Sequence, residues 1–437
     1  MIHRLFKKIT FCVALFIGVS CLSTLAQSPY KNVMIHEQSG LGYPPCEPSI
    51  AISKTDPSIM LAGAVLRYSY YSSDSGQTWT TDRMKSRHGV YGDPCIVSDD
   101  EGKFYYFHLS DPSGRGWGSP KLLDRIVCQT SKRNGKAWNR GSGVGFNHPK
   151  DQDKEWAVFD PVNNQLIVTW TQFDEYQNPD PSFQSNIMLS RSKNGRTWSE
   201  PVQLSTTPGN CLDDSQTAEG ATSGVDAEGN IYTAWSLDGK IVLTIGSVNE
   251  AGELMGFSEE ITVIQSNANW DFAIPGIKRA NGMPILKCDR SNGPNRGAIY
   301  INWSDQRNGE NDTDIWIVKS IDQGKTWSEP ARVNDDKGGH HQFFTWMDLD
   351  QSTGKLYCVF YDRRNHTDLN TDVYLAASSD GGENFQNTRI SESPFIPSEF
   401  KFFGDYNGIS AVNGVIRPIW TRHENDKQSI WTAIINE

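Results

Sequence analysis

The sequence has few of the features that mark metal-binding, redox-active or membrane-spanning proteins. Its 437 residues include only eight cysteines, and neither a Cys-x-x-Cys pair nor a zinc-type spacing occurs. The apolar run at residues 9–19 is too short to cross a membrane as a helix. Long amphipathic helices, low-complexity tracts and linkers are also absent. We therefore expect no metal, no cofactor and no membrane span.

The first 26 residues have the pattern of a secretory signal peptide. Arg4, Lys7 and Lys8 precede the apolar run, and Ala26 is a small residue at the expected cleavage position. Because the segment carries those three basic residues and no acidic one, its removal would change the formal net charge from −11 to −14. We expect a secreted, periplasmic or cell-envelope protein, with a lipid anchor at Cys21 as the alternative.

The remaining composition points to many short strands in an acidic protein. The apolar fraction is modest at 37%, whereas 14 Trp and 15 Tyr residues are available to pack neighbouring strands. The strong excess of acidic residues argues against binding to nucleic acid. The six cysteines beyond the signal segment are scattered, which predicts buried free thiols, with a Cys46–Cys95 disulfide as the alternative.

One octapeptide recurs along the chain. Ser72–Trp79 (SSDSGQTW) returns as Ser320–Trp327 (SIDQGKTW), and weaker copies lie at Ser131–Trp138, Arg191–Trp198, Ser247–Gly252 and Ser378–Phe385. Asp or Asn can close a turn on its own backbone, the Gly supplies a positive φ, and the Trp begins the next strand. A turn that recurs roughly every 60 residues predicts a repeat architecture with one supersecondary unit per period.

These octapeptides resemble the Asp boxes, or BNR repeats, of the sialidase superfamily. The resemblance extends from about Glu47 to the end of the chain. It implies an all-β propeller of four-stranded antiparallel blades, in which each Asp box joins the third and fourth strands. It also implies a secreted, exo-α-sialidase-like glycoside hydrolase that acts on a carboxylate-bearing sugar, although a fold by itself does not define a function.

A second repeat gives the number of blades. Seven hairpins lie between the Asp boxes, at Glu47–Arg67, Asp93–Ser110, Glu155–Asp174, Gly220–Asp238, Pro284–Asp305, Gln342–Asp362 and Asp405–Arg422. The last blade lacks an outer strand, which the alternating segment Asn32–His36 can supply. We therefore predict seven blades in a single domain over residues 27–437, closed by an N-terminal strand, with six blades as the alternative.

Charged residues recur at the two ends of each hairpin, which should meet at one mouth of the central channel. The residues before the inner strands are Glu47, Asp93, Asp153–Glu155, Glu219, Trp270–Asp271, His340–His341 and Asp405–Tyr406. The residues after the second strands are Arg67, Asp174–Glu175, Asp305, Arg307, Asp362–Arg364 and Arg422–His423. Two of these groups combine Asp with Arg: Asp305 with Arg307, and Asp362 with Arg363–Arg364. We call them the Asp-Arg units, and their arginines present planar guanidinium groups suited to binding a carboxylate.

The resemblance assigns roles to several of these residues. Sialidases hold the substrate carboxylate with three arginines and use a Tyr nucleophile, a Glu partner and an Asp acid/base. In this sequence those catalytic roles fall on Tyr406, Glu219 and Asp93. The substrate-binding set is then Arg67, Arg307, Arg363, Arg364, Asp305, Asp362 and His341, where Arg67 replaces the first arginine that Cys46–Ile50 lacks.

Two other functions remain open at this point. A polysaccharide lyase for uronic-acid glycans could use His340 or His341 as base, Tyr406 as acid and Arg364 to neutralise the carboxylate. A non-catalytic propeller could bind a glycan or a protein. In each case we expect a monomer whose ligand is a carbohydrate or, for the last, a protein.

Overall fold

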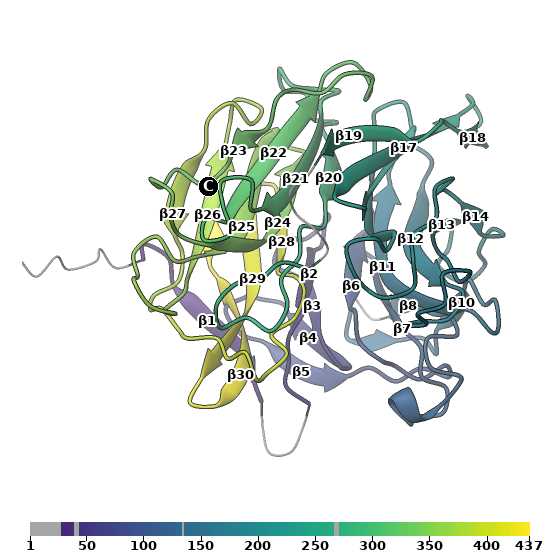
Figure 1. Ribbon diagram of the computed structural model, residues 1–437, viewed down its shortest axis with the longest axis horizontal. Coiled ribbons are helices and arrows are strands. Elements are labelled where there is room, and N and C mark those ends of the chain that lie inside the picture. Colours follow the sequence, from purple (N-terminus) through teal and green to yellow (C-terminus); the bar gives the residue numbers. More distant parts are fainter. Residues whose placement is uncertain (1–27, 39–42, 133–134, 266–270) are drawn as a thin grey trace, which may run out of the picture.

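The computed structural model describes residues 28–38, 43–132, 135–265 and 271–437. The predicted signal peptide and Trp270 lie outside these residues. The described chain is almost entirely β, with one short 3₁₀ helix, η1 (Gly116–Gly118). Its strands form seven antiparallel sheets that are the blades of a propeller (Figure 1). The prediction of a seven-bladed, all-β propeller is therefore confirmed, and the six-bladed alternative is wrong.

The blades follow one another along the chain, each beginning with its innermost strand. Blade 1 contains β2 (Ser49–Ile52), β3 (Met60–Ala64), β4 (Tyr68–Ser72) and β5 (Thr80–Arg83). Blade 2 contains β6 (Cys95–Ser98), β7 (Phe104–Leu109), β8 (Ile126–Lys132), β9 (Ala137–Trp138) and β10 (Ser142–Val144). Blade 3 contains β11 (Asp151–Asp160), β12 (Gln165–Phe173), β13 (Ser185–Ser192) and β14 (Val202–Gln203). Blade 4 contains β15 (Glu219–Val225), β16 (Ile231–Leu237), β17 (Lys240–Val248), β18 (Leu254–Phe257) and β19 (Ile261–Gln265).

The remaining blades repeat this order until the ring closes. Blade 5 contains β20 (Ile285–Cys288), β21 (Ile299–Asp305), β22 (Asp314–Ser320) and β23 (Ala331–Arg332). Blade 6 contains β24 (Gln342–Asp350), β25 (Lys355–Asp362), β26 (Asp372–Ser378) and β27 (Gln386–Arg389). Blade 7 contains β28 (Gly408–Val412), β29 (Val415–Glu424), β30 (Lys427–Ala433) and β1 (Asn32–Glu37), with β31 (Ile435–Asn436) paired to β29.

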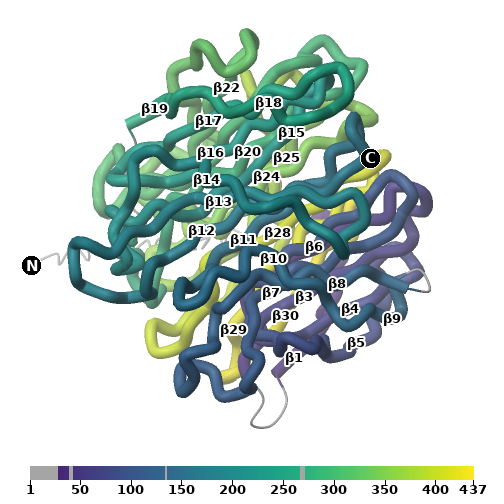
Figure 2. The backbone as a smooth tube through the Cα atoms, turned by 90° about the vertical axis from the view of Figure 1, so that its right-hand side faces the viewer, coloured from purple at the N-terminus to yellow at the C-terminus, as the bar shows by residue number. Residues whose placement is uncertain are grey.

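The N-terminal strand completes the last blade. β1 pairs antiparallel with β30, from Asn32 opposite Ala433 to Glu37 opposite Ser429, and the two strands run side by side in both views (Figures 1 and 2). Ile35 of β1 is buried in an apolar cluster that includes residues of β2, β3, β29 and β30. The predicted closure is confirmed, and it removes the free edge that β30 would otherwise expose.

The recurring octapeptide forms the turn between the third and fourth strands. In its first copy, one oxygen of Asp74 accepts hydrogen bonds from Ser72 Oγ (2.8 Å) and the Thr78 amide (2.9 Å), while the other accepts from Thr78 Oγ1 (2.6 Å). Asp322 repeats these contacts with the same distances. The Asp side chain therefore closes the turn, as predicted.

Aromatic side chains fill the space between blades. Trp170, Trp235, Trp303 and Trp420 each lie in the second strand of a blade and are fully buried. The six described cysteines are buried and unpaired, so the predicted free thiols are confirmed and the alternative Cys46–Cys95 bond does not form. Among the described residues there is no helix long and apolar enough to span a membrane.

Candidate functional site

Backbone irregularities turn side chains from several blades into one mouth of the channel. The inner strands β11, β15 and β24 each contain a register shift, at Asp153/Trp156, Glu219/Thr222 and Phe343/Trp346. Within these bulges, or just before the inner strand in blades 1 and 2, one residue has a positive φ: Glu47, Asp93, Lys154, Gly220 and Phe344. Four of these five are not glycine, so the fold maintains a conformation that ordinary side chains avoid.

A buried lysine is at the centre of the mouth. Lys154 Nζ is paired with Asp405, and lies 3.6 Å from Asp93 Oδ2 and 3.9 Å from Glu47 Oε1. These three carboxylates come from blades 7, 2 and 1, so one ammonium group joins four blades. Gly404 permits the close approach of the first and last blades, because a Cβ there would lie 2.8 Å from Glu47 Cγ.

A half-buried arginine extends this network toward blades 4 and 5. Arg279 Nε donates to Asp405 Oδ1 (2.9 Å), and its Nη1 donates to Asp213 Oδ2 (2.9 Å). The same Asp213 oxygen accepts a hydrogen bond from the Tyr176 hydroxyl (2.8 Å). The Asn281 amide donates to the Asp405 carbonyl (2.8 Å), which holds that loop in place.

The carboxyl groups of the mouth occupy two kinds of electrostatic environment. Burial alone would raise the pKa of Asp405, but the positive charges of Arg279 and Lys154 outweigh burial and hold its pKa well below the ordinary range. Burial raises the pKa of Asp93, and Lys154 only partly offsets this rise. Burial, with Asp93 as the next cause, raises the pKa of Asp153 to about 8. One ionised carboxylate is therefore surrounded by groups that favour the protonated state.

Two further glutamates are buried without hydrogen-bond partners in the described part of the chain. Neither carboxyl oxygen of Glu155 or of Glu219 has such a partner, and both side chains are almost completely inaccessible to solvent. Burial is the largest cause that raises the pKa of each, followed by Asp93 for Glu155 and by Asp213 for Glu219. Unpaired buried carboxylates are costly, so we expect both to carry a proton.

The network forms one wall of a narrow pocket with a cavity volume of about 40 Å³. Its polar lining includes Asp93, Lys154, Glu155, Asn281 and Asp405. Its apolar lining includes Trp156, Met283, Phe344, Trp346 and Tyr406. A mostly apolar pocket with a few convergent polar groups is the usual form of a small-ligand site.

Three aromatic rings form the floor of this pocket. Trp156 and Trp346 contact each other with ring centroids 4.3 Å apart, and the Tyr406 ring lies 5.6 and 5.8 Å from them. The same two Trp residues also line a second, larger cavity that continues along the inner strands of all seven blades. The central channel is thus divided by the rings into a charged mouth and a separate chamber.

The predicted catalytic residues come together at this mouth, but not in the predicted pairing. Tyr406 and Asp93 line the pocket, and Glu219 belongs to the surrounding network. The Tyr406 hydroxyl donates weakly to the Pro94 carbonyl at 3.4 Å, whereas the Glu219 carboxyl has no hydrogen-bond partner among the described residues. Burial and then Asp93, Glu47 and Glu155 raise the pKa of Tyr406 well above its ordinary value, so its phenol stays neutral.

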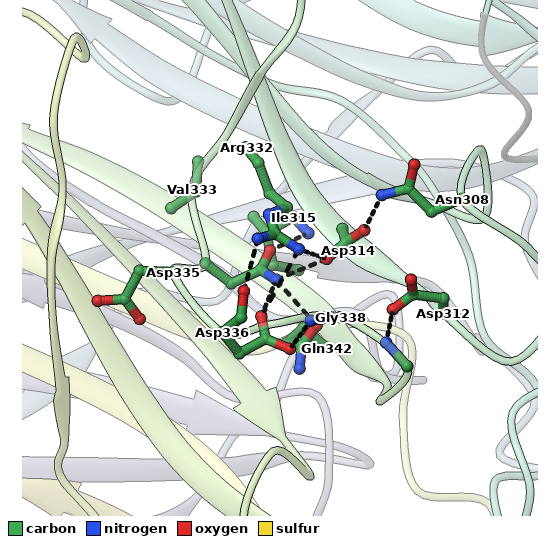
Figure 3. A network of polar contacts seen from close by, with 12 residues as sticks. Asn308, Asp312, Asp314, Ile315, Arg332, Val333, Asp335, Asp336, Gly338 and Gln342 are labelled. Atoms are coloured by element: carbon green, nitrogen blue, oxygen red, sulfur yellow. Dashed lines mark hydrogen bonds and ion pairs between the residues drawn. The ribbon is translucent and has the colours of Figure 1, made fainter.

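The two Asp-Arg units are local ion pairs away from the pocket lining. Arg307 Nε donates to both oxygens of Asp305 (2.9 and 3.0 Å), and its guanidinium lies over the Trp316 ring. Arg364 Nε donates to Asp362 Oδ2 (2.7 Å), and its Nη1 pairs with Asp335. In Figure 3, Asp335 points away from the neighbouring network around Asp314. No residue of these units lines the pocket.

The other predicted binding residues are also placed elsewhere. Arg363 is buried, with Nε bonded to Thr371 Oγ1 (3.0 Å) and Nη1 to the Pro275 carbonyl (2.7 Å). His341 Nδ1 is 2.9 Å from Thr313 Oγ1, and burial lowers its pKa to about 4. Arg67 is exposed in the turn between β3 and β4. None of these three residues lines the pocket, and their substrate-binding roles stay predictions.

Sequence reasoning missed the residues that reach the mouth from loops. Arg279, Asp213 and Tyr176 lie outside the hairpin ends used for prediction, and only their contacts identify them. Trp156 follows directly after the predicted Asp153–Glu155 segment, so its position next to charged residues was the available signal. Trp346 gave no comparable signal.

Fold and mouth together define a seven-bladed β-propeller with one charged, aromatic-floored pocket. No protein-family model and no curated protein sequence matches the chain. Among solved structures, a protein of unknown function from Dyadobacter fermentans is similar in fold, with a TM-score of 0.51, 12% identity, and coverage of 94% of this chain and 98% of that one.

Two glycosidases are more distantly similar. The α-L-arabinanase of Penicillium chrysogenum, complexed with arabinobiose, has a TM-score of 0.48 at 14% identity and covers 80% of this chain and 98% of its own. The Hadza microbial sialidase Hz136 has a TM-score of 0.48 at 14% identity, with coverage of 86% and 73%. At these identities the likeness concerns the fold alone.

Proposed function

We propose that the protein is a glycan-acting enzyme that hydrolyses a glycosidic bond in the pocket at the channel mouth. One observation carries this proposal. Asp93 and Asp405 line the same pocket and share Lys154, yet their pKa values are moved in opposite directions. Carboxyl pairs whose environments separate their pKa values are suited to the acid and the ionised roles of glycoside hydrolysis.

The chemistry assigns one role to each group. Asp93, whose pKa is raised by burial, would donate a proton to the glycosidic oxygen as the bond to the anomeric carbon breaks. Asp405, kept ionised by Arg279 and Lys154, would stabilise the positive charge that develops on the sugar ring. Water then adds to the anomeric carbon and gives up a proton to the Asp93 carboxylate, which restores the starting state of the acid. Tyr406 and Trp346 would contact the apolar faces of the sugar, because the negative face of an aromatic ring attracts polarised C–H groups.

The charge of the pocket favours a neutral sugar over the carboxylate-bearing sugar expected from the resemblance. Lys154 and Arg279 are both engaged by carboxylates, and Lys154 is the only cationic residue in the described lining. The arginines predicted to bind a substrate carboxylate lie outside that lining. An acidic sugar would therefore meet the ionised Asp405 without a free guanidinium group to neutralise the sugar's charge.

A screen for product chemistry tests this proposal. The purified protein is incubated with arabinan, xylan, mannan and galactan, with sialosides, and with uronic-acid polysaccharides. New reducing ends and the ultraviolet absorbance of unsaturated products are measured. We expect reducing ends from a neutral glycan, and a loss of about 100-fold or more in kcat for Asp93→Asn because the proton donor is removed. Asp238→Asn, a change at an exposed carboxylate, should leave kcat unchanged.

Each contrary result points to a different function. Unsaturated products would indicate a lyase, and cleavage of sialosides would restore the acidic-sugar prediction. Full activity in Asp93→Asn would contradict the role given to that residue. Binding of a glycan without any product would favour a non-catalytic glycan-binding propeller, which the closed ion-pair network around Lys154 also suits.

A further inference from the structure

A second aromatic surface lies beside the mouth, on loops of blades 2 and 3. Trp117 lies in η1, on the loop between β7 and β8, and 64% of its surface is exposed. Its ring stacks on Tyr176, from the loop between β12 and β13, with centroids 5.3 Å apart and an interplanar angle of 22°. Tyr91 meets the Trp117 ring edge-on at 6.1 Å. We call these three residues the aromatic platform.

The platform is rigidly supported on the loop that carries Trp117. Asp111 accepts hydrogen bonds from the Gly116 amide (2.9 Å) and from Ser113 Oγ (3.0 Å), which fixes the turn before η1. Gly116 has a φ of +53°, and a Cβ there would approach Tyr91 Cε2 to 3.2 Å. The loop is therefore built so that the exposed Trp ring rests against the two Tyr rings.

The loop of blade 3 is anchored equally well. The Tyr176 amide donates to Asp151 Oδ2 (2.9 Å), and the Phe173 ring meets the Tyr176 ring edge-on at 5.0 Å. Lys150 pairs with Asp174 at 2.7 Å across the base of the loop. Two well-held loops thus present one large aromatic ring to solvent, which an isolated surface residue does not require.

The aromatic platform is continuous with the candidate site. The hydroxyl of Tyr176 donates to Asp213, which also binds Arg279, and Arg279 binds Asp405 of the pocket. Tyr91 lies close enough to Asp111, Asp153 and Asp93 for these charges, after burial, to raise its pKa. One end of the platform therefore borders the mouth, and the exposed face of Trp117 lies farther out.

We propose that the aromatic platform binds sugar residues beyond the one held in the pocket, so that the substrate is a neutral oligosaccharide or polysaccharide chain. This inference rests on the proposed function in taking the pocket as a glycan site. Flat aromatic faces attract the polarised C–H groups of neutral sugar rings. A polyanion is disfavoured because Asp111 and Asp213 border the platform, and the pocket itself holds the ionised Asp405.

Binding of a length series tests this proposal. Xylo-, manno-, galacto- and arabino-oligosaccharides of one to six sugars are titrated calorimetrically into the wild type and into Trp117→Ala, Trp117→Phe and Phe400→Ala. In at least one series we expect affinity to rise with length. Trp117→Ala should weaken the longest chains by about tenfold, as is usual for a truncated aromatic anchor, while affinity for the shortest ligands is unchanged. Trp117→Phe should retain most of the affinity for long chains.

The controls separate a binding role from a structural one. Phe400 is an aromatic residue with 88% exposure, remote in sequence from the aromatic platform, and its removal should change no affinity. Equal weakening of short and long ligands by Trp117→Ala would show that the change distorts the pocket. That result, the absence of length dependence, or failure of all four series to bind the wild type would each overturn the proposal.

The same measurements distinguish this inference from the proposed reaction. If long chains bind in a Trp117-dependent way and no reducing ends appear, the platform stands and hydrolysis fails. If a glycan is hydrolysed and its long chains bind Trp117→Ala as tightly as the wild type, hydrolysis stands and the platform fails.

Discussion

At the scale of single residues, the mouth is organised by an imbalance of charge. Lys154 and Arg279 provide two positive charges, while Glu47, Asp93, Asp153, Asp213 and Asp405 are all within their electrostatic reach. Burying charges is tolerated only when they are paired, so the unpaired acids are driven toward the neutral form. The fold thereby favours protonated carboxyl groups in this buried region.

Asp153 makes this imbalance measurable as a dependence of stability on pH. Its pKa is raised to about 8, so the folded state favours the protonated acid, and that contribution is lost as the pH rises through this value. We expect the free energy of unfolding to fall between pH 6.5 and pH 8 by about 1–2 kcal/mol. Asp153→Asn should reduce the slope. Denaturant unfolding at a series of pH values measures it.

Two comparisons separate the contribution of Asp153 from those of other titratable groups. The pKa of His341 is lowered to about 4, so its contribution is complete above its ordinary value near 6.5 and does not enter this range. Asp238→Asn, at an exposed carboxylate, should keep the wild-type slope. A stability that rises over this range, or an equal slope in Asp153→Asn, would contradict the prediction.

The sequence identified the hairpin ends that meet at the mouth, because position relative to a strand can be read from the repeats. Asp93, Glu219 and Tyr406 were found in this way. The partners of those residues could not be predicted. Asp305 with Arg307 looked like a ligand site, yet two residues of spacing let the guanidinium fold back on its own neighbour. Arg279 is 126 residues from Asp405, and only the closed ring brings them together.

At the scale of elements, the short strand β1 completes the last blade of the ring. Five of its residues pair with β30, and Ile35 is its one fully buried side chain. Alternation of apolar and polar residues was enough to predict the strand, and a missing partner was enough to place it. The bulges in β11, β15 and β24 were not predictable, because each depends on contacts with the neighbouring blades.

Ile35→Ala tests the contribution of this strand. Removing the buried side chain leaves a cavity against the β2, β3 and β30 residues of its cluster, which should cost about 2–4 kcal/mol of unfolding free energy. Met34, which is 48% exposed on the same strand, is the matched site, and Met34→Ala should cost much less. Chemical denaturation of both variants decides the matter, and equal effects would argue against a packed closure strand.

At the scale of the whole molecule, a buried arginine also joins the two ends of the ring. Arg417 in β29 donates through Nε (3.0 Å) and Nη2 (2.9 Å) to the Ser75 carbonyl in the first Asp-box turn. Its Nη1 donates to the Ile416 and Ile435 carbonyls. Burial lowers its pKa to about 10. The guanidinium therefore spans blades 7 and 1, and it has no carboxylate partner among the described residues.

Arg417→Met should destabilise the ring without touching the mouth. The change leaves buried carbonyl groups without donors, which should cost about 2–3 kcal/mol and lower the thermal midpoint. Glycan binding measured well below that midpoint should be unchanged, because the Asp-box turn follows the third strand of its blade, at the end opposite the mouth. Arg196→Met, at an exposed site, provides the comparison. An unchanged midpoint, or weakened glycan binding in the folded variant, would contradict this account.

The aromatic floor also determines how a ligand can enter and leave the pocket. Because Trp156 and Trp346 close the channel beneath the pocket, the mouth has a single entrance, and a product of the proposed reaction would leave by the opening through which its substrate arrived. A glycan cannot be threaded through the ring and released on the other side. Turnover would then proceed one encounter at a time, and accumulated product would compete with fresh substrate for a single entrance.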